Sequence, residues 1–114
     1  MKISVDWYLY TDGDFNLKNC KKYNGNDTNN DGYIFSGKTE FKSKDDDCIS
    51  ETLRYLEKML CDIHVSYTHY YLIRDIYNMF IQLIDFVLEE ECGTKTVSLG
   101  GNYSKTKFTI TITN

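Results

Sequence analysis

A short polar stretch of the chain carries oxygen-bearing side chains at alternate positions, an arrangement that suits a hard cation. Asp27, Asn29 and Asp31 alternate along this stretch, and Gly32 permits a sharp turn directly before Tyr33. Three side-chain oxygens and the backbone carbonyl of Tyr33 would then converge on one calcium ion. Calcium is the one cofactor that the sequence suggests.

The same stretch resembles the first part of an EF-hand calcium-binding loop, over about eight residues. Two departures from that family stand out. The twelfth position is Lys38, where the family has a bidentate glutamate, and Glu40 comes two residues too late. The flanking segments are also typical of strands rather than helices. A polar hairpin loop in an asparagine-rich chain is the alternative, and it is favoured because the motif lacks its structural context.

The histidines suggest a second kind of site. His64 and His69 are the two histidines of the chain, and with Cys61 they would form a metal cluster or a paired-histidine nuclease site. Cys61 and His64 have helical spacing, but a zinc site needs a third ligand and, for catalysis, a general base. The chain contains no nucleophile elbow, phosphate-binding glycine loop or nucleotide fingerprint. We therefore expect no enzymatic activity and no catalytic residues.

Hydrophobic alternation predicts three strands before the first helix. Two strands over 3–9 and 15–23 are expected to form a hairpin around a three-residue loop, with Leu9 opposite Leu17. A third strand follows over 33–41 and contains Gly37, which would form a β-bulge.

After the third strand, the spacing of apolar residues changes to the period of an α-helix and predicts two helices. Apolar residues spaced by three and four predict a first helix with one buried face, which begins near its N-cap Asp47. A second helix over 67–92 is apolar around most of its circumference, and Gly93 would cap its end. The predicted buried face of the first helix comprises Ile49, Leu53, Leu56, Leu60 and Ile63.

A C-terminal hairpin completes the pattern. Segments rich in β-branched residues, 94–99 and 108–113, flank a glycine-containing turn. The element order is therefore βββααββ. We predict a single α+β domain over residues 1–114, in which an antiparallel β-sheet is packed on one face by a two-helix layer.

Composition and charge exclude several classes of function. The chain has 114 residues, 13 Lys and Arg against 17 Asp and Glu, and a net charge of -4. Because the cationic residues do not cluster, direct binding to nucleic acid is not expected. Asp6 interrupts the N-terminal apolar run and charged residues interrupt the second helix, so neither a signal peptide nor a membrane span is predicted. We expect a cytoplasmic protein whose four cysteines are free thiols.

Tyrosines and acidic clusters mark the surface that we expect to bind a partner. The chain has ten tyrosines, more than a small core can absorb, because each hydroxyl needs water or a partner. Biased composition alone is the alternative explanation. The tyrosines that we expect to bind a partner lie on the strand face opposite Trp7 and at the start of the second helix. The acidic clusters lie at the two ends of the helical region. The predicted partner-binding residues are Tyr8, Tyr10, Asp45, Asp46, Asp47, Tyr67, Tyr70, Tyr71, Glu89, Glu90 and Glu91.

These features predict a non-catalytic protein-binding module. Small size, acidic charge and the lack of an active-site constellation are shared by inhibitors and antidotes of phages and mobile elements, such as toxin-immunity and anti-CRISPR proteins. The expected partner is a nuclease or another nucleic-acid-binding protein, whose basic surface the acidic middle of the chain would complement. Two alternatives remain: a calcium-binding module, and a homo-oligomeric structural protein such as a homodimer joined through the second helix.

Overall fold

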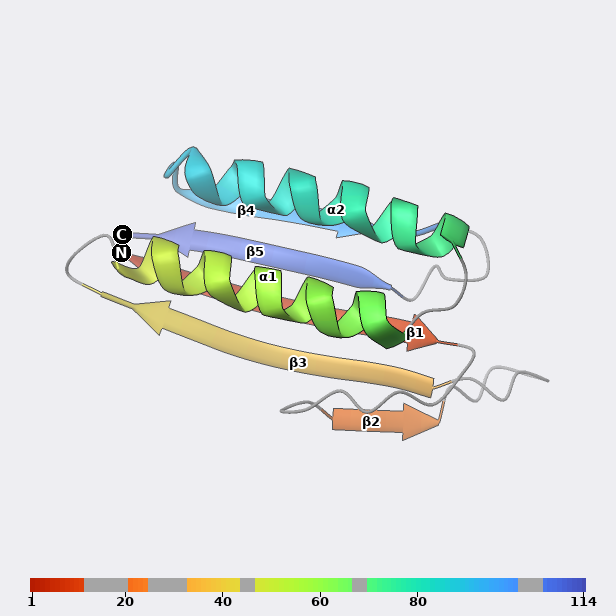
Figure 1. Ribbon diagram of the computed structural model, residues 1–114. Coiled ribbons are helices and arrows are strands. Elements are labelled where there is room, and N and C mark those ends of the chain that lie inside the picture. The colour runs from red at the N-terminus through yellow and green to blue at the C-terminus, as the bar shows by residue number, and fades with distance from the viewer. Residues whose placement is uncertain (12–20, 25–32, 44–46, 67–69, 101–105) are drawn as a thin grey trace.

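A computed structural model describes residues 1–11, 21–24, 33–43, 47–66, 70–100 and 106–114. These residues form an α+β fold with the predicted order βββααββ (Figure 1). The elements are β1 (Lys2–Thr11), β2 (Lys21–Asn24), β3 (Tyr33–Lys42), α1 (Asp47–Ser66), α2 (Tyr70–Leu88), β4 (Gly93–Ser98) and β5 (Lys107–Thr113).

The strands form one antiparallel sheet in the order β2-β3-β1-β5-β4. The C-terminal hairpin of β4 and β5 is confirmed, but the predicted hairpin between the first two strands is wrong. Leu9 of β1 lies opposite Phe35 of β3, and β2 pairs with β3 instead. β3 matches all ten residues of β1, whereas β2 has only four residues, so pairing β1 with β3 buries more backbone and side chains. Leu17 lies outside the described residues.

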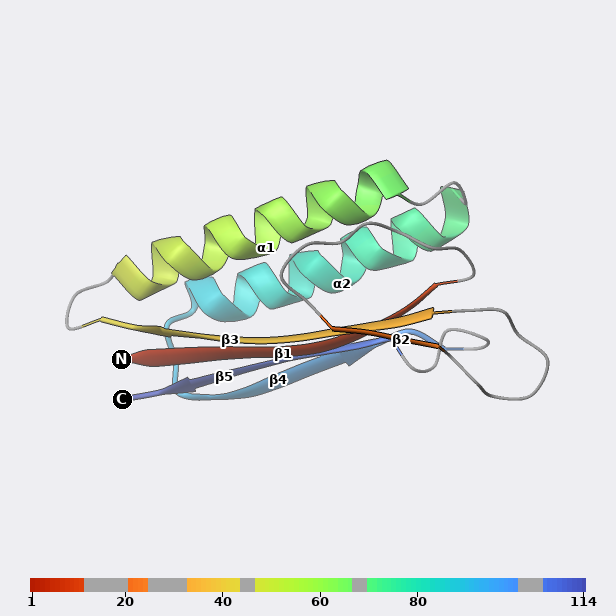
Figure 2. The same cartoon turned by 90° about the horizontal axis from the view of Figure 1, so that it is seen from below.

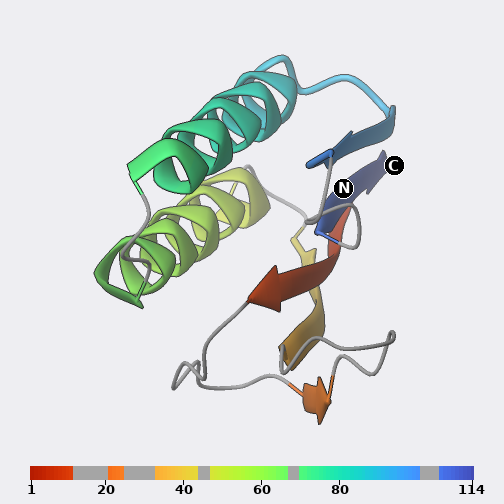
Figure 3. The same cartoon turned by 90° about the vertical axis from the view of Figure 1, so that its right-hand side faces the viewer.

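Both helices cover the same face of the sheet, as predicted (Figures 2 and 3). β1 presents its odd-numbered residues to the helices, and β5 presents its even-numbered ones. On the helix side of this core, α2 contributes residues that are spaced about one helical turn apart. The core residues of these three elements are Ile3, Val5, Trp7, Leu9, Phe108, Ile110, Ile112, Ile76, Met79, Phe80, Leu83 and Val87.

Gly37 does not form the predicted bulge. It lies in continuous register directly opposite Trp7, and a Cβ atom at this position would lie 2.6 Å from the indole Nε1 of Trp7. The absence of a side chain therefore makes room for the indole, whose Nε1 donates a hydrogen bond to the hydroxyl of Tyr55 in α1 at 2.9 Å. Trp7 also stacks on Phe108, at 5.9 Å between ring centroids. This position is a close packing contact between β3 and β1.

The helices differ in detail from their predicted patterns. α1 begins at Asp47 as expected, but Leu53 and Leu60 are only half-buried and pack at the margin of the core. Their places in the core are taken by residues such as Thr52 and Met59. None of the helices in the described ranges combines the length and apolarity that a membrane span requires.

The end of α2 also departs from expectation. The helix ends at Leu88, and Glu90 takes the left-handed conformation with φ 57°. The backbone N–H of Glu90 donates to the carbonyl of Val87 at 3.2 Å, which tightens this last turn. Gly93 is not the helix cap that was predicted, because it already belongs to β4, where it has φ 150°. A glutamate therefore occupies the position where glycine is usually found.

Candidate protein-binding surfaces

Charge is separated between the two layers of the fold. The helix layer, defined here as α1, α2 and residues 89–91, carries nine carboxylates and three Lys or Arg residues. The five strands carry seven lysines and two carboxylates. The helix layer is therefore acidic and the sheet is basic, although the net charge of the chain is small.

An exposed apolar strip runs along the helix layer. Tyr77, Ile81 and Leu88 are 38%, 53% and 55% exposed, and their spacing of four and seven residues places them on one side of α2. Tyr77 borders α1, because its hydroxyl lies 3.2 Å from Nδ1 of His64 and the two rings meet edge to face. We call these three residues the α2 strip. Large apolar side chains exposed in a row are typical of surfaces that another molecule covers.

Exposed carboxylates share the helix layer with this strip. They come from both helices and from the residues that follow α2, and every one of them is exposed. Protein interfaces commonly combine exposed apolar residues with charged ones. The carboxylates are Asp47, Glu51, Glu57, Asp62, Asp75, Asp85, Glu89, Glu90 and Glu91.

The two tyrosines predicted on β1 have different environments. Tyr8 is 54% exposed on the face of the sheet that the helices leave open. Tyr10 is only 5% exposed, which corrects the expectation that its ring lies at the surface. Tyr10 lies opposite half-buried Ile34, and its backbone N–H donates to the buried hydroxyl of Thr106 at 3.0 Å. Tyr10 is therefore not available to a partner in this conformation.

The remaining predicted partner-binding residues lie around the helices. Asp47 and the triplet 89–91 are exposed at the start of α1 and beyond the end of α2. Asp45, Asp46 and Tyr67 lie outside the described residues, as do the side chains of Tyr70 and Tyr71, although their backbone begins α2.

Sequence reasoning did not place Ile81 and Leu88 in the predicted surface. The available signal was the apolar circumference of α2, which is too wide for the sheet and α1 to cover completely. Only the packing of the two helices shows which apolar residues are left exposed.

The calcium site stays a prediction, because Asp27, Asn29 and Asp31 lie outside the described residues. Tyr33 begins β3, where it is paired with Thr11 and Asn24. Glu40 lies seven residues beyond Tyr33 on the extended strand β3, roughly 23 Å from it. Its carboxylate forms an ion pair with Lys2 at 3.4 Å.

The histidine and cysteine residues do not assemble into a metal site where the structure describes them. Within those ranges, no three His, Cys, Asp or Glu side chains are grouped closely enough to hold an ion. Cys61 and His64 are exposed one turn apart on α1, and His69 lies outside the described residues. Cys48 is a buried free thiol, while Cys61 and Cys92 are exposed free thiols.

Comparison of the chain with protein-family models, curated proteins and solved structures finds no match. The class that the fold defines is a two-layer α+β protein with an acidic helix layer on a basic sheet. A functional assignment therefore depends on the chemistry of these surfaces.

Proposed function

We propose that the protein is a non-catalytic protein-binding module that inhibits a nucleic-acid-processing protein through its helix layer. The observation that carries this proposal is that the exposed apolar α2 strip belongs to a helix layer whose nine carboxylates are all exposed. A protein that handles nucleic acid presents a basic surface, and the acidic helix layer complements it.

The two parts of this surface have different roles. The carboxylates steer association and make it fast at low salt, because long-range attraction acts before contact. The α2 strip supplies the apolar contact that slows dissociation, since Ile81 and Leu88 would each contribute roughly 1 kcal/mol when their exposed halves are buried. Occupation of the partner's basic surface would exclude its nucleic acid substrate.

Affinity capture with matched variants tests this proposal. Tagged wild-type protein is compared with Ile81→Ser/Leu88→Ser and with the control Tyr8→Ser, which removes an exposed ring from the opposite face. We expect wild type and control to capture one stoichiometric partner from cells of the encoding organism, and the double variant to lose it at least about tenfold. The captured protein should bind nucleic acid, and adding wild type should reduce its activity.

Three outcomes contradict the proposal. The first is capture that the double variant and the control lose equally, and the second is capture of no stoichiometric partner. The third is a homodimer by light scattering that Ile81→Ser/Leu88→Ser dissociates, which would assign the α2 strip to a second copy of the chain.

A further inference from the structure

The outer edge of β3 is only partly paired. β2 pairs with residues Tyr33–Ser36, and within the described ranges no strand lies against the outer edge of residues 37–42. The inner edge of these residues is paired with β1 throughout. An extended strand whose outer amide and carbonyl groups lack a neighbouring strand is a template for a further strand.

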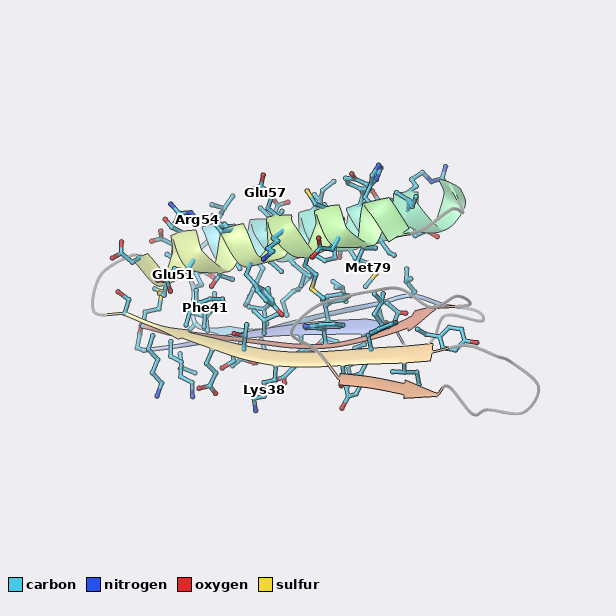
Figure 4. The ribbon with its side chains drawn as sticks, turned by 60° about the horizontal axis from the view of Figure 1, so that its bottom comes forward. Lys38, Phe41, Glu51, Arg54, Glu57 and Met79 are labelled. Carbon is cyan, nitrogen blue, oxygen red and sulfur yellow. The ribbon has the colours of Figure 1, made fainter. Side chains whose placement is uncertain are left out.

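A groove beside this edge has an aromatic wall. It lies between β3 and α1 and has a volume of about 590 Å³. Phe41 of β3 and Tyr55 of α1 line it, and their rings pack edge to face with centroids 5.8 Å apart. Figure 4 shows Phe41 between the sheet and α1, while Lys38 points to the opposite side of the sheet. A strand added to β3 would thus meet aromatic rings on one face.

The charge of the groove differs from that of the rest of the helix layer. Arg54 and Lys58 are the two Lys or Arg residues of α1, and both line the groove. Lys38 of β3 borders the groove at the strand, but its side chain points to the opposite side of the sheet. Among the residues that the structure describes, Glu51 is the one carboxylate that lines the groove. All four side chains are exposed. A cationic groove within an otherwise acidic layer selects an acidic ligand.

We propose that the outer edge of β3 binds an extended acidic segment of another protein by β-strand addition. Backbone hydrogen bonds to residues 37–42 hold the added strand, and its alternate side chains lie on the two faces of the sheet. On the helix side they meet Phe41 and Tyr55 below the cations of α1, and on the open side they meet Lys38.

This proposal does not depend on the α2 strip. The groove lies on the β3 side of α1, whereas Tyr77 of the strip contacts His64 on the α2 side. The two surfaces therefore have separate tests. The variant Ile81→Ser/Leu88→Ser should bind the probe peptide below as well as wild type does.

The probe is a capped seven-residue peptide of three valines flanked on each side by two glutamates, so that both faces carry acidic and apolar side chains. It is titrated into isotopically labelled full-length protein while amide resonances are followed by NMR. We expect shifts and slowed hydrogen exchange in residues 37–42. In Arg54→Gln/Lys58→Gln the affinity should fall about tenfold, while Lys107→Gln, an exposed lysine on β5, should leave it unchanged.

Two control peptides separate strand addition from simple charge attraction. Methylation of the three valine backbone nitrogens should abolish binding, because it removes the donors of the added strand. Replacement of the glutamates by lysine should also abolish it. Equal binding of the N-methylated peptide, or no shift at millimolar peptide, overturns the proposal. If the double variant does not give a folded spectrum, Lys38→Glu provides the same test from β3.

Discussion

The two faces of the sheet differ in the burial and the polarity of their side chains. On the face beneath the helices, the β1 residues Ile3, Val5, Trp7 and Leu9 are almost fully buried. On the open face, the intervening positions carry Tyr8, lysines and a ladder of threonines, in which Thr94 lies 3.3 Å from Thr111 and Thr96 lies 3.2 Å from Thr109 between hydroxyl oxygens. The pleat of each strand therefore assigns packing to one face and polar chemistry to the other.

The same comparison extends to the two layers. The acidic helix layer would attract a basic partner, while the cations beside β3 would attract an acidic one. Opposite charges on one small protein let two surfaces select different partners. Stability should depend on the covered face, and binding on the helix surface and the β3 edge.

The largest loss of stability is expected on the covered face, from Gly37→Ala. The new Cβ would lie 2.6 Å from the rigid indole of Trp7, so the ring or the strand must move. We expect the free energy of unfolding to fall by about 2–3 kcal/mol, measured by urea denaturation.

Gly100→Ala is the matched control, because a Cβ there meets nothing within 4 Å. Equal losses of unfolding free energy in the two variants would show that the contact with Trp7 is unimportant. Packed and open glycine positions would then not differ in their effect on stability.

A smaller effect is expected from removing hydroxyl groups. Tyr55→Phe removes the acceptor for Nε1 of Trp7 and leaves a buried donor unsatisfied, which should cost about 1–2 kcal/mol. Tyr77→Phe removes an exposed hydroxyl, next to His64, and should change stability by less than about 0.5 kcal/mol. Thermal and urea unfolding of the two variants measure the difference. If Tyr77→Phe is the more damaging change, the seam between the helices matters more than the packing of α1 on the sheet.

The smallest effect, a gain, is expected in the acidic layer from Glu90→Gly. Glycine adopts the left-handed φ of 57° without steric cost, so stability should rise by about 0.5–1 kcal/mol. Glu90→Gln separates this backbone effect from the removal of a negative charge at the end of α2. Urea unfolding in low and high salt compares the two variants. A gain of equal size in Glu90→Gln, lost in high salt, would assign the effect to charge instead.

Much of the fold could be predicted because the signals are local. The alternation Ile3, Val5, Trp7 and Leu9 predicts a strand with one buried face, and the structure has it. The start of α1 at Asp47 and the hairpin of β4 and β5 are likewise encoded by neighbouring residues. The predicted partner of β1 was wrong, because β1 pairs with β3 and β5, which are distant from it in the chain, and local patterns do not specify such pairings.

The candidate site was only partly predictable for the same reason. Tyr8 and the triplet 89–91 are exposed as expected, whereas Tyr10 is buried. Ile81 and Leu88 are exposed because two helices and a sheet leave one side of α2 uncovered. Periodicity shows that a residue is apolar and on which side of its helix it lies, but not what packs against that side.

The amino-acid sequence by itself therefore determined the α+β class, the order of the elements and which residues of β1 face the core, since these follow from side-chain periodicity within each segment. Tertiary structure decided the strand order, the exposure of the α2 strip and the position of Arg54 and Lys58 of α1 beside the outer edge of β3. These depend on contacts between segments far apart in the chain, which local patterns do not specify.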